Sequence, residues 1–181
     1  SLLLALKATQ VMLGTKKLAA ILAGVGLLAS GAAQATLYDR GGGLIYDDVL
    51  KITWLKDANY AKTSGYDADG RMNWGAANAW AAGLSYFDSV RNVTWTDWRL
   101  PTVSPVGAAF NYDFSNNGTT DYGFGNTSPN SEMAYMYYVN LGNLGFCTPD
   151  NGNPTSCVEQ AGWGLAHTAP FDNLQSYVYW S

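Results

Sequence analysis

Alternating hydrophobic and polar positions predict short strands toward both ends of the chain. Residues 36–48 contain two apolar runs on either side of three consecutive glycines, 41–43, and such a glycine cluster is typical of a hairpin turn. The segment 51–55, KITWL, alternates in the same way and predicts a third strand. The aromatic run SYVYW at 176–180 also alternates and predicts a strand near the end of the sequence.

Apolar residues at helical spacing predict one helix that begins after Asn73 and ends near Gly83. Asn is a good N-cap, because its side-chain oxygen accepts a hydrogen bond from a backbone N–H of the first turn. Glycine is common where helices end. The residues that repeat on the predicted buried face are Trp74, Ala77, Ala81 and Leu84.

A second helix is predicted over 131–143, SEMAYMYYVNLGN. Ser131 is the expected N-cap, and Glu132 lies in the first turn, where the helix dipole favours an acidic side chain. A stripe of Met and aromatic residues at helical spacing is typical of a side that faces the core. Here the stripe consists of Met133, Met136, Tyr137 and Leu141.

Long loops connect these elements, above all residues 111–130, which are rich in Gly, Asn, Ser and Thr. This composition predicts surface loops or sets of short turns. Two helices, short strands and long loops together predict an α+β fold in which the loops carry the function.

The first 35 residues have the layout of a secretory signal peptide. Two lysines precede the apolar run 18–28, and the small-residue site AQA ends at Ala35. We therefore expect cleavage between Ala35 and Thr36. A membrane-spanning helix is the alternative, but it needs about 20 apolar residues and this run is shorter.

The residues after the expected cleavage site, 36–181, are enough for one domain with its own core. Met12 is a plausible start of translation, so residues 1–11 are candidates for sequence upstream of the gene. The chain ends inside the strand predicted at 176–180. We therefore expect the domain to be truncated at its C-terminus.

The charge of the mature part excludes one class of function. Seven basic residues remain against fourteen acidic ones, a net charge of −7, and no Lys or Arg follows Arg99. Nucleic-acid binding needs a basic face that neutralises phosphates, so it is excluded. A partner of this surface is expected to be a glycan, a protein or a metal cation, and no transmembrane helix is expected in the mature part.

Cys147 and Cys157 are predicted to form a disulfide that holds a loop. An exported chain meets an oxidising compartment, which favours a bridge over two thiols. The residues between them, TPDNGNPTS, are rich in turn formers and let the two cysteines meet. Two Cys and the single histidine, His167, do not make a four-ligand zinc site.

Catalytic motifs are missing from the sequence: it contains no G-x-S-x-G, no H-E-x-x-H and no G-x-x-x-x-G-K-[ST]. The weak candidates for metal ligands are Asp67 and Asp69, which are spaced like the first two ligands of a calcium loop. Arg71 occupies the next ligand position, so an Asp-Gly turn before a helix is favoured over a calcium site.

The segment TDWRLPT, 96–102, is interpreted as scaffold. Trp98 and Leu100 alternate inward, as in a buried strand. Arg99 is expected to hold neighbouring carbonyls or a carboxylate through its guanidinium group. Pro101 ends the strand, because it has no N–H to donate.

Five segments, in order along residues 37–181, carry a resemblance to a known family. They are LYDRGGGLIYDD with ITWLKDANYA, then GYDADGRMNWGAANAWA, DWRLPT, SEMAYMYYVNLGNLG and PFDNLQSYVYWS. These segments resemble the Lcl C-terminal domain family, a domain of unknown function in exported bacterial proteins, some of which carry a PEP-CTERM sorting tail. The resemblance implies a periplasmic, extracellular or cell-surface protein of a Gram-negative bacterium. It also implies further strands after residue 181.

The segment 73–102 is similar, more weakly, to the C-type-lectin-like fold shared with formylglycine-generating enzymes. This similarity implies a compact α+β domain whose variable loops bind sugars or proteins. The cysteine and metal residues of the formylglycine-generating enzymes have no counterpart here.

The leading hypothesis is an exported, non-enzymatic recognition or surface-adhesion module that binds a carbohydrate or a protein. A secreted polysaccharide hydrolase that uses scattered Asp and Glu residues is the alternative. A structural envelope or matrix protein is the third option. No cofactor is expected, with calcium at Asp67 and Asp69 as the one candidate.

Overall fold

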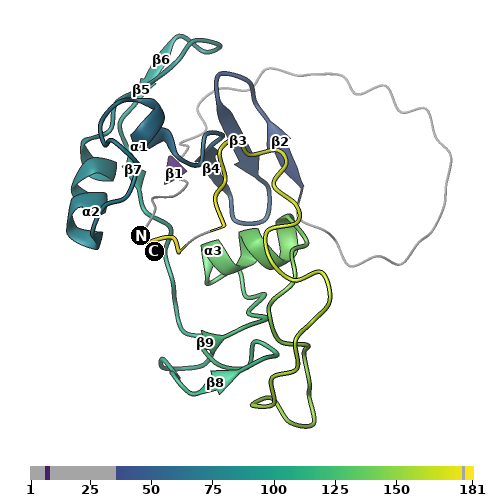
Figure 1. Cartoon of the computed structure of the whole chain (residues 1–181). Coiled ribbons are helices and arrows are strands. Elements are labelled where there is room, and N and C mark those ends of the chain that lie inside the picture. The colour runs from purple at the N-terminus through teal and green to yellow at the C-terminus, as the bar shows by residue number, and fades with distance from the viewer. Residues whose placement is uncertain (1–6, 9–35, 177) are drawn as a thin grey trace, which may run out of the picture.

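The computed structural model describes residues 7–8, 36–176 and 178–181, and it is an α+β arrangement, as the sequence predicts (Figure 1). Within these residues the main sheet has five strands, and neighbouring strands run antiparallel. Their order is β2 (Leu37–Asp39), β3 (Leu44–Asp47), β4 (Ile52–Leu55), β1 (Lys7–Ala8) and β7 (Trp98–Arg99).

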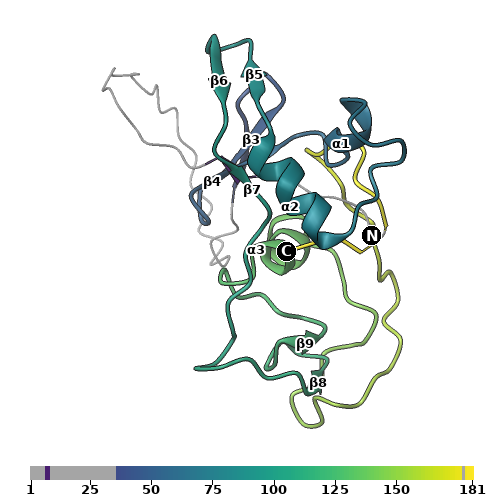
Figure 2. The same cartoon turned by 90° about the vertical axis from the view of Figure 1, so that its left-hand side faces the viewer.

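The remaining elements are short helices and two-stranded sheets outside the main sheet. Strands β5 (Tyr86–Asp88) and β6 (Val93–Trp95) form an antiparallel hairpin, whereas β8 (Phe114–Ser115) and β9 (Tyr122–Gly123) pair in parallel. The helices are α1 (Tyr60–Thr63), α2 (Trp74–Gly83), α3 (Glu132–Tyr135) and the π-helix η1 (Met136–Asn140). In Figure 2 the β5–β6 hairpin lies at the top and β8 and β9 lie at the bottom.

The main sheet has a hydrophobic cluster on each face. Leu44 and Leu55 lie opposite each other in β3 and β4 and belong to the cluster that contains the buried side of α2. Their neighbours Ile45 and Trp54 also face each other, but they belong to the second cluster, with Met136 of η1. Since successive side chains of a strand point to opposite faces, the sheet is covered on both sides.

The hairpin predicted around the glycine cluster is present as β2 and β3, and the strand predicted at 51–55 is β4. The turn needs glycine, since Gly43 has a φ of +75° and a Cβ there would lie 2.2 Å from the Tyr86 hydroxyl. The same hydroxyl donates a hydrogen bond to the carbonyl of Gly42 at 2.8 Å. The turn is therefore fixed against the β5–β6 hairpin.

The helix predicted after Asn73 is α2, and it ends at Gly83 as expected. The Asn73 side chain accepts a hydrogen bond from the N–H of Ala76 at 2.9 Å. The predicted buried face is wrong at Trp74, which is 54% exposed, whereas Trp80 is 5% exposed and packs in the first cluster. Trp74 lies at the first position of the helix, and its indole donates instead to the carbonyl of Ser181 at 3.3 Å.

The helix predicted at 131–143 is shorter, because it changes into a π-helix at Met136. Ser131 is the N-cap residue, as predicted, but its side chain makes no capping hydrogen bond. Glu132, at the first position of α3, is bonded to Arg99 and to the backbone of Thr102 instead of to its own helix. Met136 and Leu141 are buried, as the core-facing stripe predicts.

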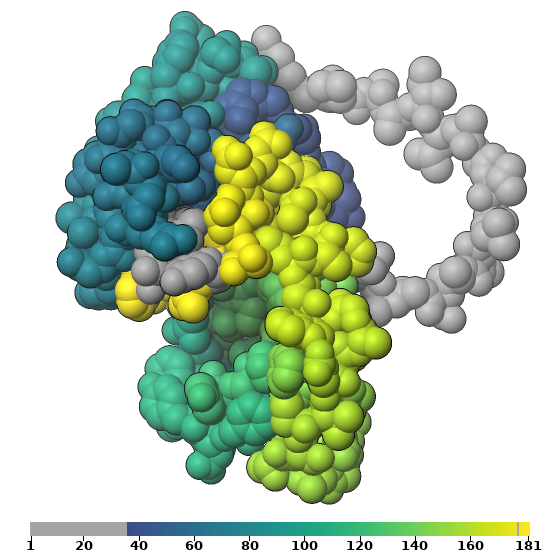
Figure 3. All heavy atoms as spheres, in the orientation of Figure 1, coloured from purple at the N-terminus to yellow at the C-terminus, as the bar shows by residue number. Residues whose placement is uncertain are grey.

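A loop lobe, residues 106–130 and 144–165, carries β8, β9 and both cysteines and forms the lower part of the molecule in Figure 3. The expected surface loops at 111–130 are present, but Ser115 and Asn116 within them are buried. Neither hydrophobic cluster of the sheet contains a residue of the loop lobe. The lobe is therefore held by its own contacts and by hydrogen bonds to neighbouring segments, such as the one from the Tyr137 hydroxyl to the carbonyl of Leu144.

The strand predicted at 176–180 lies partly outside the described residues, because residue 177 is not among them, and of its other residues Tyr179 takes part in a β-bridge. The Tyr179 hydroxyl accepts a hydrogen bond from the backbone N–H of Gln175 and donates one to its carbonyl. Trp180 is half-buried against the first cluster, and its indole donates to the carbonyl of Met72 at 2.8 Å.

Apart from Lys7 and Ala8, the predicted signal peptide lies outside the described residues, and so does Ala35 of the expected cleavage site. Thr36 is described and exposed, and its N–H donates to Asp48. None of the helices in the described part of the chain is long and apolar enough to cross a membrane.

Candidate functional site

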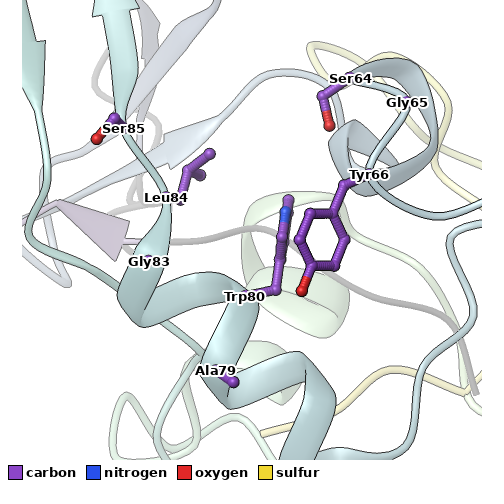
Figure 4. A pocket seen from close by; sticks show the side chains of 8 residues that line it. All are labelled: Ser64, Gly65, Tyr66, Ala79, Trp80, Gly83, Leu84 and Ser85. Carbon is purple, nitrogen blue, oxygen red and sulfur yellow. The ribbon is translucent and has the colours of Figure 1, made fainter.

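A surface pocket opens between the end of α1 and the last two turns of α2. Its volume is about 410 Å³, and its lining is Ser64, Gly65, Tyr66, Ala79, Trp80, Gly83, Leu84 and Ser85. Figure 4 shows the Tyr66 and Trp80 rings side by side, with Leu84 and Ser85 beyond them. Pockets that bind small molecules are typically lined by apolar and aromatic groups with a few polar groups among them.

The two rings differ in exposure and therefore in role. Trp80 is 5% exposed and is part of the first hydrophobic cluster, so it forms a fixed floor. Tyr66 is 61% exposed, and its ring centroid lies 6.1 Å from that of Trp80 at an interplanar angle of 48°. Ser64 adds a hydroxyl group, which donates to the carbonyl of Ala61 at 3.3 Å, whereas the Ser85 hydroxyl points away from the two rings (Figure 4). None of the eight lining residues is acidic or basic. The pocket is therefore suited to a neutral ligand.

The loop that precedes α2 holds Tyr66 in position. The Asp67 carboxylate accepts hydrogen bonds from the backbone N–H groups of Asp69, Gly70 and Arg71, at 2.7 to 3.1 Å. Gly70 has a φ of +78°, and a Cβ there would lie 1.9 Å from the Asn59 side chain. The loop is thus a tight Asp-Gly turn packed against the start of α1.

Asp67 and Asp69, the weak candidates for calcium ligands, serve this turn. The hydrogen bond from the backbone of Asp69, with those from Gly70 and Arg71, keeps the pKa of Asp67 below its usual value. Asp69 accepts from the N–H of Arg71 at 2.9 Å. In the ranges 7–8, 36–176 and 178–181, no group of three or more His, Cys, Asp or Glu is arranged to hold a metal ion.

The residues of DWRLPT do not line the pocket, and Asp97 and Thr102 among them are exposed. Trp98, Leu100 and Pro101 are buried, and the Trp98 indole donates to the carbonyl of Trp95 at 3.0 Å. Arg99 binds Glu132 with both of its terminal nitrogens, at 2.8 and 2.9 Å, and donates to the carbonyl of Leu100 at 2.7 Å. This geometry is that of a scaffold that joins β7 to α3.

The most deeply buried acidic side chains are also bonded to the scaffold. Asp47 accepts from the N–H groups of Val49 and Leu50 and from the Asn140 amide. Burial raises the pKa of Asp88, but hydrogen bonds from Arg91 and Trp95 outweigh it and leave the pKa below its usual value.

Cys147 and Cys157 are joined in a disulfide, with 4.9 Å between their Cα atoms. Cys147 is buried and Cys157 is exposed, so the bridge ties a surface turn to the interior of the loop lobe. Asn116 fixes the same turn: its N–H donates to the carbonyl of Pro154, and its side chain bonds to Ser156 and Asp150.

The loop lobe carries a second aromatic surface. Phe110 and Tyr112 are stacked, with 5.7 Å between ring centroids and an interplanar angle of 8°. They are 46% and 72% exposed, and Tyr122, which packs edge-on to Phe114, is 60% exposed. This surface is made by side chains on loops, whereas the Tyr66–Trp80 pocket has a floor that belongs to the core.

Sequence reasoning missed both aromatic residues of the pocket. Tyr66 lies in a polar turn, and Trp80 is one of several apolar residues in a predicted helix. Only the packing of α1 beside α2 brings the two segments together. The one usable signal was the short spacing of fourteen residues between two large aromatics on either side of a capped turn.

Comparison with known proteins adds no relative: no family model, no curated protein and no solved structure matches this chain.

Proposed function

We propose that this protein is an exported recognition module that binds a neutral glycan in the Tyr66–Trp80 pocket. The observation that carries the proposal is a concave site with an aromatic wall, an aromatic floor, the Ser64 hydroxyl beside them and no charged lining residue. Aromatic rings offer apolar faces to the C–H groups of a sugar, and hydroxyls can bond to its O–H groups.

Export is supported by the chemistry of the chain. The disulfide between Cys147 and Cys157 is the form of a cysteine pair that persists in oxidising compartments. The signal-peptide layout before Thr36 and the resemblance to the Lcl C-terminal domain family point the same way. A C-type-lectin-like architecture, with ligand-binding loops on a small α+β scaffold, is part of this proposal.

A non-enzymatic role is favoured by the engagement of the acidic groups. Asp47, Asp88 and Glu132 are buried and bonded within the scaffold, and Asp67 caps its own turn. A polysaccharide hydrolase would need two carboxyl groups that face a common substrate. Turnover of a glycan, lost on replacing one Asp or Glu by its amide, would establish that alternative instead. A structural matrix protein would self-associate and bind no soluble glycan.

The test is a glycan array followed by titration of the best glycan against two variants. Tyr66→Ala removes the exposed wall of the pocket and is expected to weaken binding tenfold or more, which corresponds to about 1.4 kcal/mol. Tyr112→Ala removes an equally large exposed aromatic from the loop lobe and is the matched control. Since both side chains are exposed, neither change is expected to alter the melting temperature by more than a few degrees.

The two variants separate the two aromatic surfaces. Binding that survives Tyr66→Ala but is lost in Tyr112→Ala would place the ligand on the loop lobe and contradict the pocket assignment. An array without any binding to the folded, exported protein would count against glycan recognition altogether.

A further inference from the structure

The central strand β1 of the sheet is two residues long and comes from a distant part of the chain. Lys7 pairs with Trp54 of β4 and with Arg99 of β7, and Ala8 pairs with Thr53 and Trp98. Both pairings are antiparallel. Because neighbouring strands lie about 4.8 Å apart, β4 and β7 are separated by the width of one strand.

The two walls of this space are held independently of β1. On one side, β4 pairs with β3 along its whole length, and all four of its residues are buried. On the other side, β7 is fixed by the buried Trp98 in the first cluster and by the Arg99–Glu132 contact with α3. Neither strand can therefore move toward the other without disrupting a packed face of the sheet.

An empty space at this position would be costly. The facing backbone groups of β4 and β7 lie inside the sheet, and buried N–H and C=O groups without partners destabilise a fold by about 1–3 kcal/mol each. This part of the sheet therefore favours an added strand.

We propose that β4 and β7 form a strand-acceptor site, and that its occupant is the N-terminal segment of this same chain, through Lys7 and Ala8. An extended peptide that pairs with the edges of existing strands gains affinity from main-chain hydrogen bonds, as in other cases of strand addition. The site accepts the strand antiparallel to both neighbours, so it recognises backbone direction and extended conformation.

The place of Lys7 and Ala8 in the sequence determines which forms of the chain contain the added strand. Lys7 and Ala8 precede the cleavage site expected at Ala35, and they also precede Met12. A chain that begins at either point lacks this strand. The acceptor site is then open, and the same extended segment supplied in trans is expected to fill it.

A proline at position 8 tests the proposal in the full chain. Proline has no N–H and is excluded from strands with neighbours on both sides. Ala8→Pro is therefore expected to increase amide exchange in β4 and β7 tenfold or more, while β5 and β6 keep their exchange rates. Ala8→Val, which suits a strand, is the matched control and is expected to leave all four strands unchanged.

A synthetic peptide identifies the occupant. A peptide with the sequence of residues 4–12, LALKATQVM, added to the Ala8→Pro chain is expected to restore slow exchange in β4 and β7. The same peptide with proline in place of its second alanine, which corresponds to Ala8, should have no effect. If Ala8→Pro fails to fold, thermal denaturation replaces hydrogen exchange as the measurement. Recovery of a cooperative melt with the first peptide and not with the second then supports strand addition.

Three outcomes would overturn the proposal. Exchange in β4 and β7 that is the same in wild type and Ala8→Pro would show that these strands need no third strand. Equal rescue by both peptides would show that the effect is not strand addition. A dimer of the Ala8→Pro chain with protected β4 and β7 would assign the site to a second copy of the chain.

Discussion

Arg99 connects the main sheet to α3 through two parallel hydrogen bonds. Its side chain is 33% exposed, and the Glu132 side chain that it binds is 9% exposed. Glu132 also accepts from the N–H of Thr102 at 2.7 Å, so one carboxylate fixes both the end of β7 and the segment that follows. The planar guanidinium group matches the two carboxylate oxygens, and a lysine ammonium cannot.

Arg99→Lys is expected to lower the free energy of unfolding by about 1.5–3 kcal/mol, the usual value of a hydrogen bond to a charged group. Because lysine keeps the positive charge, the loss of stability measures the contribution of the two parallel hydrogen bonds that the guanidinium group makes. Urea denaturation is the measurement. Arg71→Lys is the control, since the Arg71 side chain is 50% exposed and 3.9 Å from Asp69, and it should change stability by less than about 0.5 kcal/mol. An equal loss of unfolding free energy in Arg99→Lys and Arg71→Lys would contradict a special role of the two parallel hydrogen bonds of Arg99.

The roles of single residues were partly predictable from the sequence. The alternation of Trp98 and Leu100 marks inward-facing positions because a strand repeats every two residues. The partner of Arg99 could not be predicted, since Glu132 is thirty-three residues away and was expected to serve its own helix. Only the packing of α3 across the sheet decides between these two uses of one carboxylate.

At the scale of elements, α2 shows how a side-chain cap sets the start of a helix. The Asn73 oxygen accepts from the N–H of Ala76 at 2.9 Å, which satisfies one of the backbone donors that the first turn leaves without a partner. Nothing acidic lies in this first turn, so the cap is not supplemented by a charge near the helix dipole.

Asn73→Ala is expected to lower the free energy of unfolding by about 1 kcal/mol, because the first turn loses its cap. Asn78→Ala is the matched control in the same helix. Asn78 lies in the helix interior, where alanine is the better helix former, so this change should be neutral or slightly stabilising. Chemical denaturation of both variants checks the difference, and a larger loss for Asn78→Ala would show that the cap does not limit the helix.

The limits of element prediction are clear in α2 and α3. Trp74, Ala77, Ala81 and Trp80 are all compatible with one helical face, and spacing alone cannot decide which tryptophan is buried. The decision comes from the packing of α2 on the sheet, which places Trp80 in the first hydrophobic cluster, and the turn at Asp67 then brings Tyr66 beside it. The sequence around Met136 predicts an ordinary α-helix, and nothing in it indicates the π-helix. Lys7 lies in the predicted signal peptide, and nothing in the sequence there indicates a strand.

At the scale of the whole molecule, the sheet and the loop lobe are stabilised in different ways. The sheet has a hydrophobic cluster on each face, and no lobe residue belongs to either cluster. The lobe relies on the disulfide, on Asn116 and on aromatic contacts such as the edge-on pair of Phe146 and Trp163. Segments with few buried apolar contacts open at lower free energy than a packed core.

Replacing Cys147 and Cys157 together by serine is therefore expected to loosen the lobe and leave the sheet intact. The bridge closes a loop with a sequence separation of 10, and its removal should lower the free energy of opening of the lobe by about 2–3 kcal/mol. Hydrogen exchange checks this: amides of 110–130 and 145–163 should exchange faster, while those of β3 and β4 stay protected.

Asn116→Ala extends the same prediction without touching the disulfide. Asn116 is fully buried and bonds to the turn that the bridge closes, so its loss should also accelerate exchange in the lobe alone. If either variant instead exposes β3 and β4 to the same degree as the lobe, the two parts unfold as one cooperative unit. The Tyr112→Ala control of the binding test would then have to be replaced by a variant within the sheet, since a change in the lobe could reach the pocket.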